Sequence, residues 1–196
     1  MPTGSRRRGE ALLDAVRAAA LAEMAEYGLR GASMDRIARR ASTSKATLYR
    51  RWPNVRALAL DAFIVTLEAS QAAEYPDTGS IRDDLVDSLT DFSTAIHGSL
   101  GIVLRELISE AAHDPSLVEE FQTRFGAPQM VHVMTAMQRA MLRGEIPTNP
   151  VDPYVLEIPA AFVVHRMLMT GVPPTPSECE HIVDAIVMPL LAPAAR

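Results

Sequence analysis

Cysteine and lysine are almost missing from this chain of 196 residues. The single Cys179 excludes a disulfide framework within the chain and a cysteine cluster for zinc. Lys45 is the only lysine beside 18 arginines. Long apolar runs are missing too, since the longest stretch, 160–169, contains His165 and Arg166 and is too short to cross a bilayer. The first residues do not resemble a signal peptide, so we expect a cytoplasmic protein without a membrane partner.

The usual sequence signals of enzymes and cofactor sites are absent as well. No alternating strand pattern, glycine-rich phosphate loop or catalytic combination of Ser, His and Asp stands out. No two histidines are three or four residues apart, which argues against a metal site on a helix. Glu106 and Glu110 could resemble paired carboxylates, but we interpret them as exposed acidic helix surface. We expect no catalytic residue, no cofactor and no metal, and hence no enzyme.

The charge is distributed very unevenly along the chain. Residues 1–56 contain 12 Lys and Arg against 5 Asp and Glu, whereas residues 57–196 contain 7 against 19. A basic segment before an acidic body is typical of a module that binds a polyanion. The simpler alternative is a solvated basic face on an ordinary helical hairpin.

Residues 33–52 have the pattern of two short helices joined by a polar turn. In the first helix Met34, Ile37, Ala38 and Ala41 form one apolar face, and Ser33 precedes it as an N-cap. The second helix, 45–52, would bury Leu48 and Trp52 and leave its other large side chains outside: Lys45, Thr47, Tyr49, Arg50 and Arg51. This pattern predicts a helix-turn-helix whose second helix can enter the major groove of DNA.

The rest of the chain also has helical periodicity, with caps and prolines between the segments. The pattern predicts an all-α fold with a three-helix helix-turn-helix head and a larger helical body for ligand binding and dimerisation. We expect the DNA-binding domain over 1–54 and the body over 55–196, with 55–75 as the linking helix. The expected further helices are 8–27, 80–96, 99–112, 114–143 with a kink at 126–128, 153–170, and one that begins at 176.

The segments 25–33, 33–41 and 44–53 resemble the DNA-binding domain of the TetR family of bacterial transcriptional regulators. The resemblance covers about residues 10–60. Ser42 replaces the usual turn glycine and must adopt the same backbone conformation. Val55 replaces a common phosphate-contacting lysine, so that contact is absent or comes from Arg51 or Arg56. The candidate DNA-binding residues are Ser33, Arg36, Thr43, Ser44, Lys45, Thr47, Tyr49, Arg50, Arg51 and Arg56.

Helix 153–170 is apolar nearly all round and therefore needs partners on more than one side. A symmetric dimer through the last two helices would supply one, and the family resemblance implies the same arrangement. Alternatively, helices within 80–143 cover both faces. The candidate interface residues are Phe162, His165, Met169, Ile182, Val183, Ile186, Val187 and Leu190.

Four methionines, at 130, 134, 137 and 141, form a helical stripe. Flexible thioethers suit a pocket for apolar ligands, but they fill an ordinary core equally well. The TetR resemblance implies a ligand pocket in the body, for which the candidate lining residues are Met134, Met137, Phe162 and Met167.

The sequence thus favours a transcriptional regulator that binds double-stranded DNA, most simply a homodimeric repressor. The resemblance implies release from a palindromic operator by a small, mainly apolar effector. The alternatives are an architectural DNA-binding protein without ligand gating, and a helical small-molecule carrier or enzyme.

Overall fold

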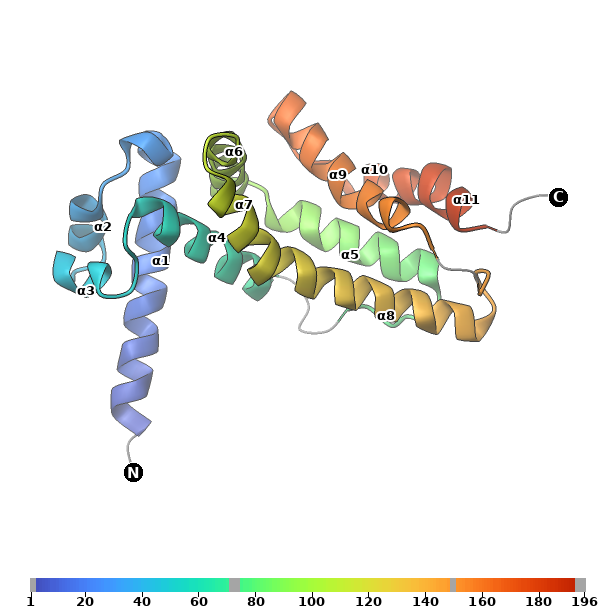
Figure 1. Ribbon diagram of the computed structural model, residues 1–196, viewed down its shortest axis with the longest axis horizontal. Coiled ribbons are helices and arrows are strands. Elements are labelled where there is room, and N and C mark those ends of the chain that lie inside the picture. The colour runs from blue at the N-terminus through green and yellow to red at the C-terminus, as the bar shows by residue number, and fades with distance from the viewer. Residues whose placement is uncertain (1–2, 71–74, 149–150, 193–196) are drawn as a thin grey trace. The chain divides into compact units, whose positions relative to one another are not determined.

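The computed structural model describes residues 3–70, 75–148 and 151–192, with side chains from residue 9 onward (Figure 1). All regular secondary structure within these ranges is helical, which confirms the predicted all-α class. The chain forms two compact units. The head unit contains the described residues up to Thr66 together with Gly98–Phe121, and the body unit contains Leu67–His97 and the described residues from Gln122 onward.

The head unit contains the predicted three helices and three further segments. Its helices are α1 (Thr3–Gly31), α2 (Met34–Arg40), α3 (Lys45–Tyr49), the first part of α4 (Val55–Ser70), α6 (Ser99–Ala111) and α7 (Pro115–Phe121). Helix α1 packs against both α2 and α6. The apolar faces predicted for α2 and α3 are buried, because Ile37 and Leu48 are fully enclosed, as is Met24 of α1.

We expected the head to end after residue 54, but the head unit extends to Thr66 and also includes the segment Gly98–Phe121. Helices α6 and α7 pack with α1 and the first part of α4, although the body segment Leu67–His97 lies between them in the chain. Hydrophobic periodicity identifies a buried face of a helix but not its partner, so this assignment was not accessible from the sequence.

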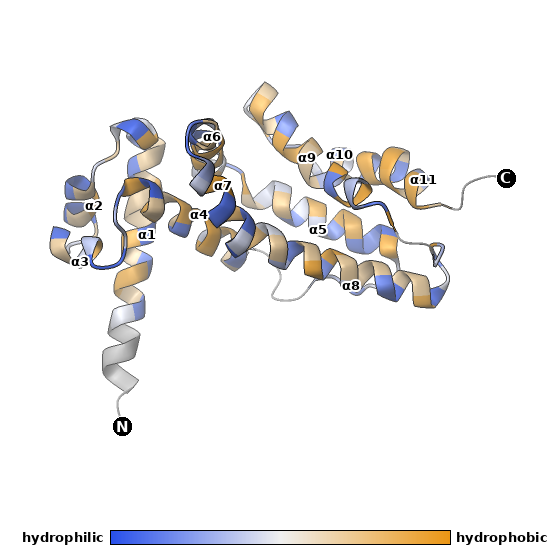
Figure 2. Cartoon of the chain, in the orientation of Figure 1, coloured by the Kyte–Doolittle hydropathy of each residue, from blue (hydrophilic) through white to orange (hydrophobic). Residues whose placement is uncertain are grey.

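The body unit is arranged around α5 (Ile81–Ala95). Helices α8 (Ala127–Arg143), α9 (Pro153–Thr170) and α10 (Pro176–Ile182) all contact α5, and α11 (Met188–Leu191) ends the described chain (Figure 1). Apolar residues predominate along α11 and much of α9 (Figure 2). The helix starts follow the predicted caps, since the Ser80 hydroxyl accepts the amide of Asp83, and Thr175 forms a complete capping box with Glu178.

Two π-helical turns interrupt the body helices, at Gln122–Gly126 and Val183–Val187. Each ends two residues before a proline, Pro128 or Pro189. Proline has no amide hydrogen and its ring clashes with the carbonyl four residues earlier, so one wider turn lets the helix continue. The predicted kink at 126–128 therefore takes the form of a π-helical turn between α7 and α8.

Candidate nucleic-acid interface and ligand cavity

Side-chain caps define both helices of the helix-turn-helix. The Ser33 hydroxyl accepts a hydrogen bond from the amide of Arg36 at 3.3 Å, so Ser33 is the N-cap of α2. The Ser44 hydroxyl accepts the amide of Thr47 at 3.1 Å and lies 2.9 Å from the Thr47 hydroxyl. A five-residue helix such as α3 has few internal hydrogen bonds, so its cap and the burial of Leu48 hold it in place.

The turn between α2 and α3 has the hydrogen bonds of a Schellman motif. The amide of Ser42 donates to the carbonyl of Arg39 at 3.1 Å, and the amide of Thr43 donates to the carbonyl of Ala38 at 2.9 Å. Ser42 has a φ of 51°, in the left-handed region that glycine normally occupies. The conformation predicted for Ser42 is thereby confirmed.

The exposed surface of α3 and the residues just after it carries the predicted reading groups. Tyr49, Arg50 and Arg51 are all exposed, and the Arg51 guanidinium lies 5.9 Å from the centre of the Trp52 ring. Lys45 is also exposed, and its ammonium lies 2.9 Å from the carboxylate of Asp35 on α2. That hydrogen bond raises the pKa of Lys45, so its positive charge is secure at neutral pH.

Two of the predicted DNA-binding arginines instead pair with carboxylates of the protein. Arg36 bonds to the fully buried Glu23 of α1 and to the carbonyl of Gly31, and its guanidinium stacks 4.4 Å from the centre of the Tyr27 ring. It therefore fixes α2 against α1. Glu23 was not among the predicted functional residues, although an acidic residue directly before Met24 on the buried side of α1 was an available signal.

Arg56 lies at the start of α4 and pairs with two carboxylates of the α6–α7 corner. It bonds to Glu110, and its Nη1 atom lies 3.3 Å from the Asp114 carboxylate. Glu110 is buried, with an exposed fraction of only 5%. Its interpretation as exposed acidic surface was therefore wrong, because α6 packs its carboxylate face against α1 and the start of α4.

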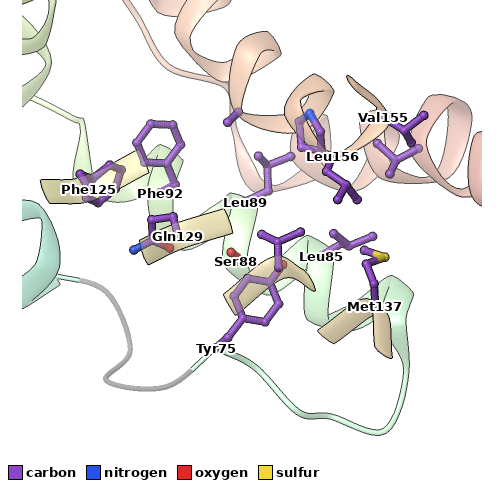
Figure 3. Close-up of a pocket in the computed structure, with 14 residues that line it drawn as sticks. Tyr75, Leu85, Ser88, Leu89, Phe92, Phe125, Gln129, Met137, Val155 and Leu156 are labelled. Carbon is purple, nitrogen blue, oxygen red and sulfur yellow. The ribbon is translucent and has the colours of Figure 1, made fainter. Parts of the chain in front are cut away.

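A cavity of about 130 Å³ lies within the body unit, between α5, α8 and α9. Figure 3 shows Phe92, Phe125 and Gln129 grouped at one end and Tyr75 and Met137 toward the other. Most of its 14 lining residues are apolar, and none carries a charged side chain. The polar groups come from Tyr75, Ser88 and Gln129. Burial raises the pKa of Tyr75, which therefore remains a neutral hydroxyl at physiological pH.

One of the four predicted ligand-pocket residues lines this cavity, and the other three lie outside it. Met137 belongs to it, but Met134 is 42% exposed and borders a shallow hollow on the outside of α8. Phe162 and Met167 lie further along α9 than the part that reaches the cavity, which ends at Ala160. The aromatic side chains at 92 and 125 were missed because they belong to different segments and nothing in the sequence relates their positions.

The predicted dimer interface divides into buried and exposed residues. Ile182, Val183 and Val187 are buried within their own chain, where the last helical segment packs on α5 and α9. These three side chains are therefore not exposed on the surface of the single chain. Phe162 is half-buried, and the remaining four are exposed: His165, Met169, Ile186 and Leu190.

Within the ranges that the structure describes, no helix has the length and hydropathy needed to cross a membrane. No group of three or more His, Cys, Asp or Glu side chains in those same ranges is placed to hold a metal ion.

These features define a helix-turn-helix DNA-binding protein with a separate helical body. Residues 16–62 match the family model described as bacterial regulatory proteins of the tetR family, and residues 75–186 match the tetracyclin repressor-like C-terminal domain. The chain belongs to the TetR family of transcriptional regulators.

Curated relatives and solved structures agree with this assignment. The chain is 32% identical over 166 residues to the uncharacterized HTH-type regulator YdeS of Bacillus subtilis, covering 85% of this chain and 83% of that one. It is 29% identical over 189 residues to the DNA-binding transcriptional repressor TetR of Mycobacteroides abscessus, covering 96% and 98%. The crystal structure of the TetR family regulator SCO0332 has a TM-score of 0.72 at 26% identity, covering 94% and 100%. These relatives are transcriptional regulators rather than enzymes.

Proposed function

We propose that this protein is a cytoplasmic repressor that binds a palindromic operator as a homodimer and is released by a small, neutral, mainly apolar effector. The observation that carries the proposal is the capped helix α3, which buries Leu48 and, with the two arginines that follow it, presents exposed Lys45 and Tyr49 and half-buried Thr47. The repressor name of the Mycobacteroides relative supports the direction of regulation.

Helix α3 would lie in the major groove, with Lys45 and Thr47 toward the base edges and Tyr49, Arg50 and Arg51 toward the phosphates. Base contacts give sequence preference, and phosphate contacts give affinity and salt dependence. Ser33, Thr43 and Ser44 surround this surface as short hydroxyl-bearing residues at the two helix starts. Arg36 and Arg56 would contribute indirectly in this conformation, because both pair with carboxylates of the protein.

Selection of bound duplexes from a random DNA pool tests the DNA-binding part of the proposal. We expect one motif with two inverted half-sites. Arg51→Ala should weaken binding to all sequences and lower the slope of log affinity against log salt by about 0.9 for each lost phosphate contact. Arg105→Ala, which removes an exposed arginine from α6, is the matched control and should leave binding unchanged. Recovery of unrelated sequences would instead identify an architectural DNA-binding protein.

Dimerisation would use the part of the predicted interface that the body core leaves free. Met169 on α9 is 69% exposed, and Ile186 and Leu190 near the end of the chain are 40% and 53% exposed. Large apolar side chains exposed on two neighbouring helical segments are suited to a two-fold contact with the same surface of a second copy. Light scattering at micromolar concentration should give the mass of two chains.

The body cavity is the proposed effector site. Its apolar walls favour an uncharged molecule, and the Tyr75, Ser88 and Gln129 side chains offer hydrogen bonds to one or two polar groups. An effector releases DNA only if it binds the low-affinity state of the protein more tightly than the operator-bound state.

Met137→Trp tests the cavity directly. If the space accepts the indole, operator binding and the melting temperature are retained and the response to effector is lost. If Met137 is ordinary core, the larger side chain lowers stability by about 1–3 kcal/mol and the melting temperature falls clearly.

A further inference from the structure

Asp35 in the first turn of α2 holds the ammonium of Lys45, the first residue of α3. The Nζ atom of Lys45 lies 2.9 Å from each of the two carboxylate oxygens. Within the ranges that the structure describes, this carboxylate has no other hydrogen bond or ion pair. The exposed fraction is 61% for the Asp35 side chain and 50% for that of Lys45, so the pair lies on the surface of the helix-turn-helix.

This ion pair contributes little to the stability of the fold, because both of its members are exposed to water. Lys45 also lies in the first turn of a helix, where the unpaired amides and the helix dipole disfavour a cation. Arg50 and Arg51 follow the same helix, and neither forms an ion pair with another described residue. A carboxylate thus accompanies the cation at the start of α3, whereas the two cations that follow its end have none.

The carboxylate changes what Lys45 can gain from an arbitrary DNA sequence. A cation that water alone surrounds gains affinity when it neutralises a phosphate and releases a counterion. The ammonium of Lys45 already has an anionic partner, so the exchange of Asp35 for a phosphate brings little. A phosphate that approaches the pair is also repelled by the carboxylate at short range. Binding to non-operator DNA would therefore depend on the arginines, with a small contribution from Lys45.

A guanine in the major groove offers the same ammonium a different partner. Its O6 and N7 atoms are two neighbouring acceptors, which lysine and arginine commonly bind together. A lysine ammonium has three N–H donors, enough for O6, N7 and one oxygen of Asp35 at the same time. The base edge carries no net charge, so the carboxylate can remain in place while Lys45 binds the base. The retained contact also limits the rotamers that this long side chain can adopt.

We propose that Asp35 is a specificity-determining residue of operator recognition, which makes Lys45 a poor phosphate ligand and directs its ammonium to a guanine in each half-site. This inference rests on the proposed reading of DNA by α3. Asp35 acts through Lys45 and is therefore a positioning residue. Its removal should strengthen binding to arbitrary DNA and weaken the choice between sequences.

Asp35→Asn removes the charge and keeps the size and polarity of the side chain. The guanine to examine is the operator position whose preference changes in Lys45→Ala. Replacement of that G·C pair by A·T should cost the unmodified protein about tenfold or more in affinity. In Asp35→Asn this discrimination should fall at least about threefold, and affinity for a non-operator duplex should rise about three- to tenfold at low salt. The slope of log affinity against log salt on non-operator DNA should steepen by about 0.9 for each half-site, as expected for one additional phosphate contact.

Glu26→Gln is the matched control, because Glu26 is also an exposed carboxylate, 2.7 Å from an exposed cation of α2, Arg40. It removes the same charge from the head and should leave the preference for guanine unchanged. A double-mutant cycle tests the route through Lys45. In a Lys45→Gln background, Asp35→Asn should change neither the guanine preference nor the salt slope. Asp35→Glu, which keeps the charge, should retain most of the discrimination.

Circular dichroism identifies a variant that does not fold, and Asp35→Ser then takes the place of Asp35→Asn. Three results would each overturn the proposal and leave operator recognition intact. They are unchanged discrimination and salt slope in Asp35→Asn, an equal loss of guanine preference in Glu26→Gln, and an undiminished effect of Asp35→Asn in the Lys45→Gln background. A random pool that yields no common motif would overturn operator recognition and this proposal together.

Discussion

Ser42 is the position where one substitution should improve the fold without touching the DNA-binding surface. Its φ of 51° places an L-residue in the left-handed region, which costs about 1–2 kcal/mol. In the described part of the chain no hydrogen bond involves its hydroxyl, and its side chain is exposed, so Ser42→Gly removes no packing. Both amide bonds of the turn are kept.

The expected gain is smaller than the full conformational cost, because glycine also loses more backbone freedom on folding, by roughly 0.5–1 kcal/mol. We therefore expect Ser42→Gly to stabilise the head by about 0.5–1 kcal/mol, which corresponds to a rise of about 1–4 °C in melting temperature for a chain of this size. Scanning calorimetry measures the shift, and a gel-shift titration should give unchanged DNA affinity.

Two control variants separate this conformational effect from a general effect of substitution. Ser42→Val puts a β-branched residue at the same positive φ and should lower the melting temperature. Ala46→Gly places a glycine within α3, at an exposed helical position, and should cost about 1 kcal/mol. If Ser42→Gly melts lower than the unmodified protein, the strain assigned to this turn is not there.

Three further predictions concern the reading helix, the dimer and the body. Lys45→Ala should change the preferred base at one position of each half-site, which selection of bound DNA with the variant would show, and an unchanged motif would exclude base contact. Ile186→Asp should leave the chain folded by circular dichroism but monomeric by light scattering, because the charge would lie unpaired in the interface. Operator binding should then be weak. A variant that remains dimeric places the interface elsewhere. The hydrogen bond from Arg82 lowers the pKa of Asp184. The pair therefore stabilises the fold above the ordinary carboxyl pKa of about 4, and this stabilisation is lost as the pH falls through the lowered pKa. Arg82→Gln should flatten that acid loss in a melting series from pH 6 to pH 3, and an identical pH profile would show that the pair has no such role.

Local features of the fold were predictable from the sequence because they depend on neighbours in the chain. The caps at Ser33, Ser44 and Thr175 each combine a hydroxyl with the amide three residues later. The left-handed turn at Ser42 followed from the resemblance to a family that places glycine there. Interactions of this range can be recognised from a few consecutive residues.

Features that depend on the rotation of one helix against another were not predictable. Arg36 and Arg56 are suited by their charge to contact phosphates. In this structure they form ion pairs with Glu23 of α1 and Glu110 of α6, because these helices turn the two carboxylates toward them. Likewise, one helical face of the final segment was assigned to the dimer, but the core of the same chain buries Val183. A periodic pattern shows that a face is covered, and only the assembled structure shows by what.

The scarcity of lysine has a practical and chemical consequence at the DNA-binding surface. Lys45 is the only side chain with a primary amine, and it is exposed on the helix proposed to read DNA. An acylating reagent directed at lysine would therefore modify a single side chain, neutralise its charge and break its bond to Asp35. The extent of acylation with and without duplex would report occupancy of the reading helix directly, with no engineered label and with the buried Cys179 left untouched.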